Sequence, residues 1–155
     1  MLCEVDQFLA AMLPRHVAAE HALCRGDADP RSETWSHRDP VTLFGAAAPV
    51  RRGWDDVSRT FRWLADRFSE LHHYEFELVT VGASGDLAYT VGFEHKTVTV
   101  DGESTTYTLR VTQVYRREDG VWKVVHRHSD HVAHNATAQQ DTAGRQSAEA
   151  EPATA

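Results

Sequence analysis

The chain has few cysteines, a shortage of basic residues and no long apolar run. Cys3 and Cys24 are its only cysteines, too few for a disulfide framework and too few to bind zinc alone. The formal net charge of −7 argues against nucleic acid as a partner. The first residues, Met1–Gln7, carry acids where a signal peptide requires basic residues, and no apolar stretch approaches a membrane span. These absences predict a soluble cytoplasmic protein with no membrane or nucleic-acid partner.

The length and composition predict one domain with a tail. The 155 residues include 41 % hydrophobic residues, enough for a core in a single domain. Residues 133–155 contain almost no large apolar side chains, which is typical of a disordered segment. We therefore expect a domain over residues 1–132 and a disordered tail over residues 133–155.

The spacing of apolar residues predicts helices, then one strand, another helix and four antiparallel strands. Pro14 interrupts helical spacing that extends from Val5 to Leu23, so it either kinks one helix or begins a second. Helices are also expected over 29–35 and 54–68, and strands over 41–44, 74–81, 87–100, 104–117 and 121–132. This order predicts an α+β fold in which helices close a curved antiparallel sheet around a cone-shaped cavity.

The last two predicted strands carry polar residues at alternate positions. Arg110 and Thr112 lie on the first strand, and His126, His128 and Asp130 lie on the second. Residues two apart on a strand share a face, so each set points one way. If the sets share a surface, an Arg, two His and an Asp beside apolar side chains resemble the lining of a polar-bottomed pocket.

The turn decides whether the two sets meet. A two-residue loop at Asp119-Gly120 would turn Arg110 to the opposite face, because a shift of one residue reverses every side chain. A three-residue loop over residues 118–120 would place His126 opposite Thr112 and His128 opposite Arg110. Both loops are common in hairpins, and we favour the three-residue loop. The opposite, convex face would then carry Val111, Gln113, Tyr115, Val125 and Arg127, which need the cover of a second subunit.

Four segments carry a resemblance to a known family. They are DPVTLFG at 39–45, GWDDVSRTFRWL at 53–64, ASGDLAYTVGFE at 83–94 and LRVTQVYRREDGVWKVVHRHSD at 109–130. They resemble the SnoaL-like branch of the nuclear transport factor 2-like superfamily, which has the ketosteroid isomerase-like fold. The last segment is also similar to the association domain of calcium/calmodulin-dependent protein kinase II. The resemblance covers roughly residues 5–132 and implies either an enzyme that needs no metal or organic cofactor, or a binding or assembly module.

The candidate catalytic residues are His126, His128, Asp130 and Asp39. Histidine both gives and takes protons near neutral pH, and a carboxylate in an apolar cleft can have its pKa raised into a useful range. The alternatives are a closed polar network for the histidines and an ordinary turn for Asp39 before Pro40. The spacing of His126 and His128 also suits two zinc ligands, but no third ligand is fixed, and we expect no metal.

The candidate substrate-binding residues surround the same predicted pocket. They are Arg110, Thr112, Glu94, Trp35, Phe44, Trp63 and Tyr74. Arg110 would hold an oxygen on which charge develops, or would be a buried cation paired with Glu94 or Asp130. The aromatic residues would shape a cleft or simply fill the core.

Two functions are therefore predicted, both in a homodimer. The first is a cofactor-independent isomerase, dehydratase or cyclase that acts on a small, largely apolar carbonyl or polyketide-like compound. The second is a non-catalytic module that binds a small ligand in an Arg-lined pocket. A general base would have a perturbed pKa and reach an open cavity, whereas a structural network would be mutually satisfied and closed.

Overall fold

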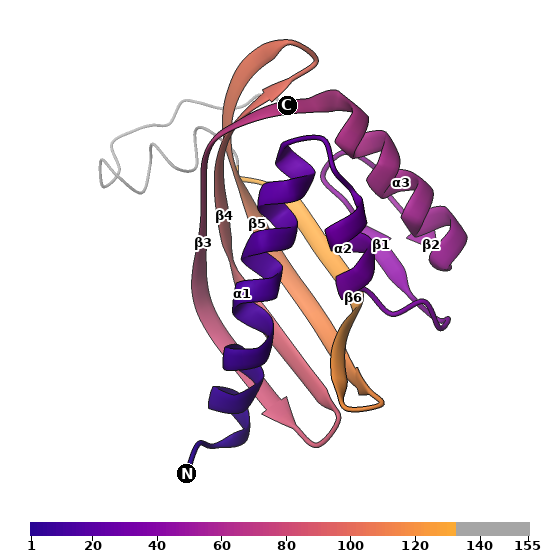
Figure 1. The fold of residues 1–155 in the computed structure, drawn as a ribbon, viewed down its shortest axis with the longest axis vertical. Coiled ribbons are helices and arrows are strands. Elements are labelled where there is room, and N and C mark those ends of the chain that lie inside the picture. The colour runs from indigo at the N-terminus through magenta and orange to yellow at the C-terminus, as the bar shows by residue number, and fades with distance from the viewer. Residues whose placement is uncertain (133–155) are drawn as a thin grey trace, which may run out of the picture.

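The computed structural model describes residues 1–132, and the predicted disordered tail lies outside them. Three helices and six strands follow one another along the chain (Figure 1). Their bounds are α1 Glu4–Cys24, α2 Asp29–Thr34, β1 Thr42–Phe44, β2 Arg51–Arg52, α3 Trp54–Arg67, β3 Phe68–Ser84, β4 Leu87–Val100, β5 Glu103–Glu118 and β6 Val121–His131. The predicted elements are present, and the structure adds β2 and an earlier start to β3.

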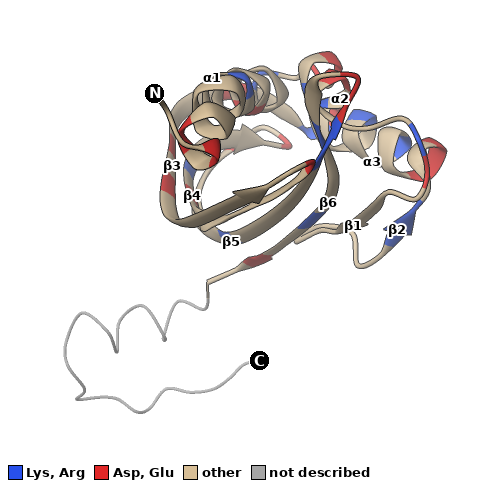
Figure 2. Cartoon of the chain, turned by 90° about the horizontal axis from the view of Figure 1, so that it is seen from below, with Lys and Arg blue, Asp and Glu red and all other residues tan. Residues whose placement is uncertain are grey.

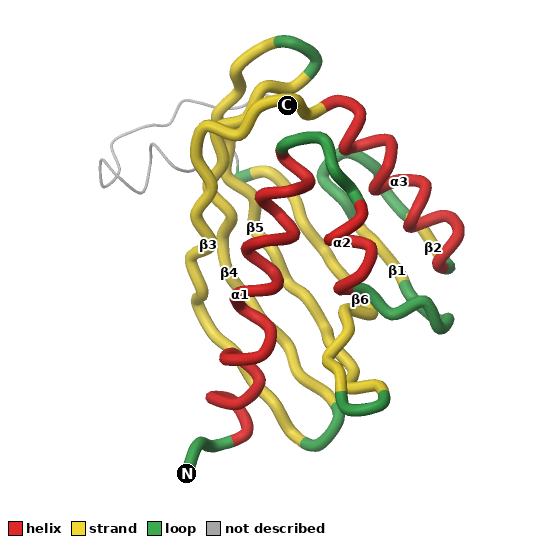
Figure 3. Tube along the Cα trace, viewed as in Figure 1, coloured by secondary structure: helices red, strands yellow, loops and turns green. Residues whose placement is uncertain are grey.

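The strands form one curved, unclosed sheet in the order β2-β1-β6-β5-β4-β3. All neighbouring pairs are antiparallel except β1 and β6, which are parallel. The helices lie together on one face of this sheet, as Figure 2 shows from below and Figure 3 shows by element type. The predicted α+β cone is therefore confirmed. None of the described helices is both long and apolar enough to cross a membrane.

The helices are amphipathic in the manner that the sequence predicts. In α1, Phe8, Met12 and Leu23 are buried, and Pro14 lies inside one continuous helix rather than beginning a second. In α3, Val57 and Phe61 face the core one turn apart, and acidic residues occupy the first turn, where the helix dipole favours them. Packing of these apolar faces against the concave side of the sheet builds the core.

The hairpin between β5 and β6 corrects the predicted turn. Glu118 pairs with Val121, so the loop is the two-residue Asp119-Gly120. Both loop residues have positive φ, 52° and 80°, which suits the tight turns that join twisted strands. The three-residue loop was therefore wrong. A β-bulge at Val125 then inserts one extra residue and shifts the later pairing by one position.

The bulge explains both the success and the error of the predicted site. Beyond it, Thr112 faces His128 and Arg110 faces Asp130, so the two polar sets do share a surface. However, the bulge also reverses which residues of β6 face inward. Trp122 and Val124 face the core before the bulge, and Arg127 faces it afterwards. Since the apolar residues must be buried, the polar sets are turned outward.

The residues expected on the convex face lie on the concave one. Val111, Gln113, Tyr115 and Arg127 are each buried, at 2–3 % exposure. Val125, in the bulge, is half-buried and packs against the core. The prediction of the convex face was therefore wrong, because alternation along a strand holds only until a bulge changes its phase.

We expect Gly92→Ala to destabilise the sheet. A Cβ at this position would overlap the backbone oxygen of Glu77 on β3 and crowd the Phe76 ring at 3.0 Å. Overpacking of this kind costs about 1–3 kcal/mol, measurable by urea unfolding. Gly85→Asn is the control, since the turn around Gly85 is open and asparagine tolerates its positive φ. A Gly92→Ala variant as stable as the parent would contradict this packing.

Candidate functional site

A cavity of about 420 Å³ lies between the concave face of the sheet and helix α3. This volume falls within the range of about 300–1,000 Å³ that is usual for small-ligand sites. Its wall is largely aliphatic and aromatic, made of Leu23, Leu43, Leu64, Phe68, Val100 and Leu109, with residues 45–48 closing one side. The cone that the sequence predicts therefore contains an apolar-walled cavity.

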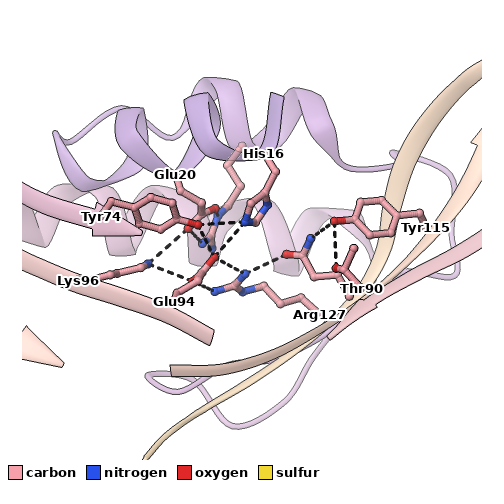
Figure 4. Close-up of polar contacts among 10 residues, drawn as sticks. His16, Glu20, Tyr74, Thr90, Glu94, Lys96, Tyr115 and Arg127 are labelled. Carbon is pink, nitrogen blue, oxygen red and sulfur yellow. Dashed lines mark hydrogen bonds and ion pairs between the residues drawn. The ribbon is translucent and has the colours of Figure 1, made fainter. Parts of the chain in front are cut away.

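Three buried cations form the floor of this cavity. Arg31 from α2, Lys96 from β4 and Arg127 from β6 all line it, and each is at most 4 % exposed. Two buried carboxylates, Glu20 from α1 and Glu94 from β4, pair with these cations (Figure 4). We call these five residues the charged floor. Three cations against two carboxylates leave one net positive charge.

Glu94 is the centre of the charged floor and has 0 % exposure. Its Oε1 accepts a hydrogen bond from Nη2 of Arg127 at 2.7 Å, and its Oε2 lies 3.3 Å from Nη1. Oε2 also accepts the Tyr74 hydroxyl at 2.9 Å and lies 3.1 Å from Nε2 of His16. A carboxylate therefore joins α1, β3, β4 and β6 at one point.

Glu20 holds the other half of the charged floor. Its carboxylate accepts two hydrogen bonds from Arg31, at 2.8 and 2.6 Å, in the parallel arrangement that makes such pairs strong. Nζ of Lys96 lies 3.4 Å from Oε1 of Glu20 and 3.5 Å from Oε1 of Glu94. Both distances exceed the 2.7–2.9 Å of a strong charged hydrogen bond. The Lys96 ammonium is thus buried between two carboxylates and held closely by neither.

The charged groups shift each other's pKa values in a consistent direction. Burial raises the pKa of Glu20, but Arg31 and Lys96 outweigh burial and lower it to about 2. Burial likewise opposes ionisation of Glu94, and Arg127 and Lys96 bring its pKa well below the usual value. The two carboxylates in turn raise the pKa of Lys96 against the effect of burial. Glu20, Glu94 and Lys96 are therefore charged at neutral pH. With the two arginines, which stay protonated in proteins, they leave one surplus positive charge.

A series of hydrogen bonds leads from Arg127 along the sheet to Gln113 and Tyr115. Nη1 of Arg127 donates to Oε1 of Gln113 at 2.9 Å, and Nε2 of Gln113 donates to the Tyr115 hydroxyl at 2.6 Å. Burial raises the pKa of Tyr115, whose hydroxyl lies 3.5 Å from that of Thr90. These hydrogen bonds satisfy the buried polar groups beside Arg127 and fix the direction of its guanidinium.

The donor set does not fit a metal ion. His16, Glu20 and Glu94 place potential ligand atoms within 4.8 Å of one another. Both carboxylates already accept hydrogen bonds from cations, and a divalent ion there would face Arg31, Lys96 and Arg127. Because like charges repel strongly at buried sites, we assign no metal to this cluster.

Three of the four predicted catalytic residues, His126, His128 and Asp130, lie on the outer face of the sheet. Asp130 accepts two hydrogen bonds from Arg110, at 2.8 and 2.7 Å, with side chains 45 % and 63 % exposed. This pairing lowers the pKa of Asp130. Nδ1 of His126 lies 2.7 Å from the Thr42 hydroxyl, and burial lowers the pKa of His126. Arg110, Thr112, His128 and Asp130 line a depression of about 380 Å³ on this face, across the sheet from the cone.

The other predicted residues are dispersed. Asp39 accepts the backbone N–H of Trp54 at 2.9 Å at the start of α3. Trp35 is buried in the core, and Trp63 is exposed with Arg67 over its ring. Phe44 makes T-shaped ring contacts with His126 and His128, with ring centroids 5.1 and 5.4 Å apart. Of the predicted residues, Glu94 belongs to the charged floor, and Tyr74 donates a hydrogen bond to Glu94.

Sequence reasoning missed four residues of the charged floor, namely Glu20, Arg31, Lys96 and Arg127. One signal was available for Lys96, because it lies two residues after Glu94 on one strand and therefore shares its face. Arg127 carried no such signal, since the bulge at Val125 determines its direction.

Comparison with known proteins agrees with this architecture. A nuclear transport factor 2-like protein from Streptomyces avermitilis, named as a candidate dehydratase, is 22 % identical with a TM-score of 0.68, and the match covers 83 % of this chain and 98 % of that one. A ketosteroid isomerase-like protein from Erwinia carotovora atroseptica is 19 % identical with a TM-score of 0.67, and the match covers 81 % of this chain and 96 % of that one. A protein from Thiobacillus denitrificans, named as a candidate calcium/calmodulin-dependent protein kinase type II association domain, is 19 % identical with a TM-score of 0.67, and the match covers 79 % of this chain and 96 % of that one. The domain thus shares the fold of these three structures.

The family follows from the sequence itself. A family model described as a SnoaL-like domain matches residues 17–133, so the chain belongs to the SnoaL-like family, as its motifs predict. No curated protein matches the chain. At identities below 25 %, the solved structures establish a shared fold and leave the activity to be argued from the site.

We expect Glu20 to make stability depend on pH in the acid range. Its pKa falls from 4.5 to about 2 on folding, so its stabilisation is present above pH 4.5 and is lost as the pH falls towards 2. The shift corresponds to about 3 kcal/mol of unfolding free energy. Urea unfolding between pH 6 and pH 2.5 measures it.

Glu20→Gln should weaken that dependence and lower stability at pH 7, because Arg31 loses its partner in a buried position. Glu33→Gln, at an exposed position on α2, is the matched control. An identical pH dependence in the parent and in Glu20→Gln would refute the buried pairing.

Proposed function

We propose that the protein binds a small organic molecule in its cone. The apolar body of the ligand packs against the aliphatic wall, and an anionic oxygen contacts Lys96 and Arg127. The observation that carries this proposal is the net positive charge of the charged floor, enclosed at the bottom of an apolar cavity. An anion there would neutralise a charge that is costly to bury alone.

Lys96 is the residue best placed to take the ligand oxygen. An ammonium group has three N–H donors, and the two carboxylate contacts of Lys96 are 3.4 and 3.5 Å long. Tyr107, on the strand position paired with Lys96, also lines the cavity and offers a hydroxyl. Together these groups support an oxygen-binding site at the deep end of the cone.

The same floor is suited to an oxygen on which negative charge develops during a reaction. A cofactor-independent isomerase, dehydratase or cyclase, as the sequence predicts, needs such stabilisation of an enolate. We favour binding over acid–base catalysis because Glu20 and Glu94 have lowered pKa values and are poor proton acceptors near neutral pH. His126, His128 and Asp130 lie across the sheet from the cavity and do not reach it.

We expect the protein to bind 3-phenylpropionate and to reject its neutral analogue, 3-phenylpropionamide. In Lys96→Met, the affinity for the carboxylate should fall by about tenfold to a hundredfold, the range for losing one charged hydrogen bond. Isothermal titration calorimetry measures both affinities. Lys123→Met is the matched control and should bind as the parent does, because Lys123 donates to the backbone oxygen of Glu33 and does not line the cavity.

Two results would overturn the proposed function. One is equal affinity for the carboxylate and the amide in the parent protein. The other is unchanged carboxylate affinity in Lys96→Met, with near-ultraviolet circular dichroism confirming that the variant remains folded.

We also propose that two copies associate through the outer face of the sheet. Apolar side chains are exposed there, including Val79 at 58 % and Tyr89 at 45 %, with Val91 and Phe93 beside them. Exposed apolar patches rimmed by charge are typical of protein interfaces. The charged rim contains both signs, as in the pair of Arg110 and Asp130, so the face is suited to another copy of itself.

We expect Val79→Glu to convert the dimer to a monomer in size-exclusion chromatography with light scattering. A carboxylate inside an apolar interface would lack a partner and would be costly to bury. Val121→Glu places the same change at an exposed position beside the β5–β6 turn and should leave the dimer intact. A parent protein that is monomeric at micromolar concentration would contradict the proposed association.

A further inference from the structure

The mouth of the cone has the opposite charge to its floor. The exposed residues Asp101 and Glu103, at the turn between β4 and β5, line the entrance together with Arg67 at the end of α3. Nη2 of Arg67 lies 3.1 Å from Asp101, and its guanidinium stacks over Trp63 at 4.8 Å. Asp101 and Glu103 against Arg67 leave one net negative charge at the mouth, with His131, which also lines the cavity, counted as neutral.

The charged floor accommodates one anionic group and no more. It carries a single surplus positive charge, and Glu20 and Glu94 already accept two hydrogen bonds each, from Arg31 and Arg127 respectively. Between floor and mouth the wall is largely apolar, so we expect a second charge on a ligand to lie at the entrance. Such a charge would lie beside Asp101 and Glu103.

We propose that the cone selects singly charged carboxylates, its floor taking the carboxylate and its acidic mouth rejecting a second negative charge at the far end of the ligand. This inference rests on the proposed function and specifies its ligand class. The favoured ligand is therefore a monocarboxylate with an apolar body and a neutral or cationic tail.

The dimensions of the cone fit a ligand of this kind. Lys96 and Val100 lie four residues apart on β4, and Glu103 pairs with Val100 at the mouth. At about 3.3 Å per residue, the floor and the mouth are separated by about 13 Å. An aromatic ring with a short alkyl acid therefore reaches from the Lys96 ammonium to the neighbourhood of Glu103.

Two ligands that differ by one charge at the far end test the proposal. They are 3-(4-carboxyphenyl)propionate, which has a second carboxylate, and 3-(4-carbamoylphenyl)propionate, which has a neutral amide of the same shape. By calorimetry at pH 8 and low ionic strength, we expect the dianion to bind about tenfold more weakly than the amide, from like-charge repulsion. Added salt should narrow the difference because the mouth is exposed.

The variant Glu103→Gln tests whether the weaker binding of the dianion comes from the acidic residues at the mouth. It should strengthen binding of the dianion by about threefold and change binding of the amide by less, because only the dianion has a negative charge beside Glu103. Glu33→Gln, which removes an equal charge from an exposed position on α2, should change neither affinity.

The outcomes separate the two proposals. Equal binding of the dianion and the amide, or no response to Glu103→Gln, would overturn the selectivity while leaving the cone as an anion site. If neither ligand binds and 3-phenylpropionate does not bind either, the proposed function itself fails.

Discussion

The buried ion pair of Glu94 and Arg127 is the interaction on which the site depends. It connects β4 to β6 across β5 and also receives His16 from α1, so it joins the helical layer to the sheet. A buried pair of this kind contributes little net stability, because removing two charges from water costs about as much as their attraction returns. Its larger effect is geometric. It fixes the direction of Arg127 and places the Glu94 carboxylate 3.5 Å from Nζ of Lys96.

The net charge of the charged floor follows from the ionisation of its five residues. Two carboxylates with lowered pKa values remain ionised at neutral pH, and three cations outnumber them. In an apolar surrounding, the surplus charge interacts strongly with any anion that enters, since there is little water to screen it. Thus the features that make this cluster an unsuitable general base also make it a strong site for an anionic oxygen.

The sequence predicted the architecture more accurately than the site. Regular spacing is repeated many times along α3 and along the β4–β5 hairpin, so single errors do not change the result. The site depended instead on one extra residue, Val125, whose bulge reverses the facing of everything after it. The alternation of polar and apolar residues along a strand does not indicate where a bulge interrupts it. His126 and His128 were therefore placed in the cavity and Arg127 on the surface, the reverse of what is found.

A crystal structure of the protein with 3-phenylpropionate tests the central claim most directly. The account predicts the ligand in the cone, with its carboxylate within about 3 Å of Nζ of Lys96 and its ring against Leu109 and Phe68. It would be contradicted by a ligand bound on the outer face beside Arg110 and His128, or by a ligand whose carboxylate points out of the mouth of the cone.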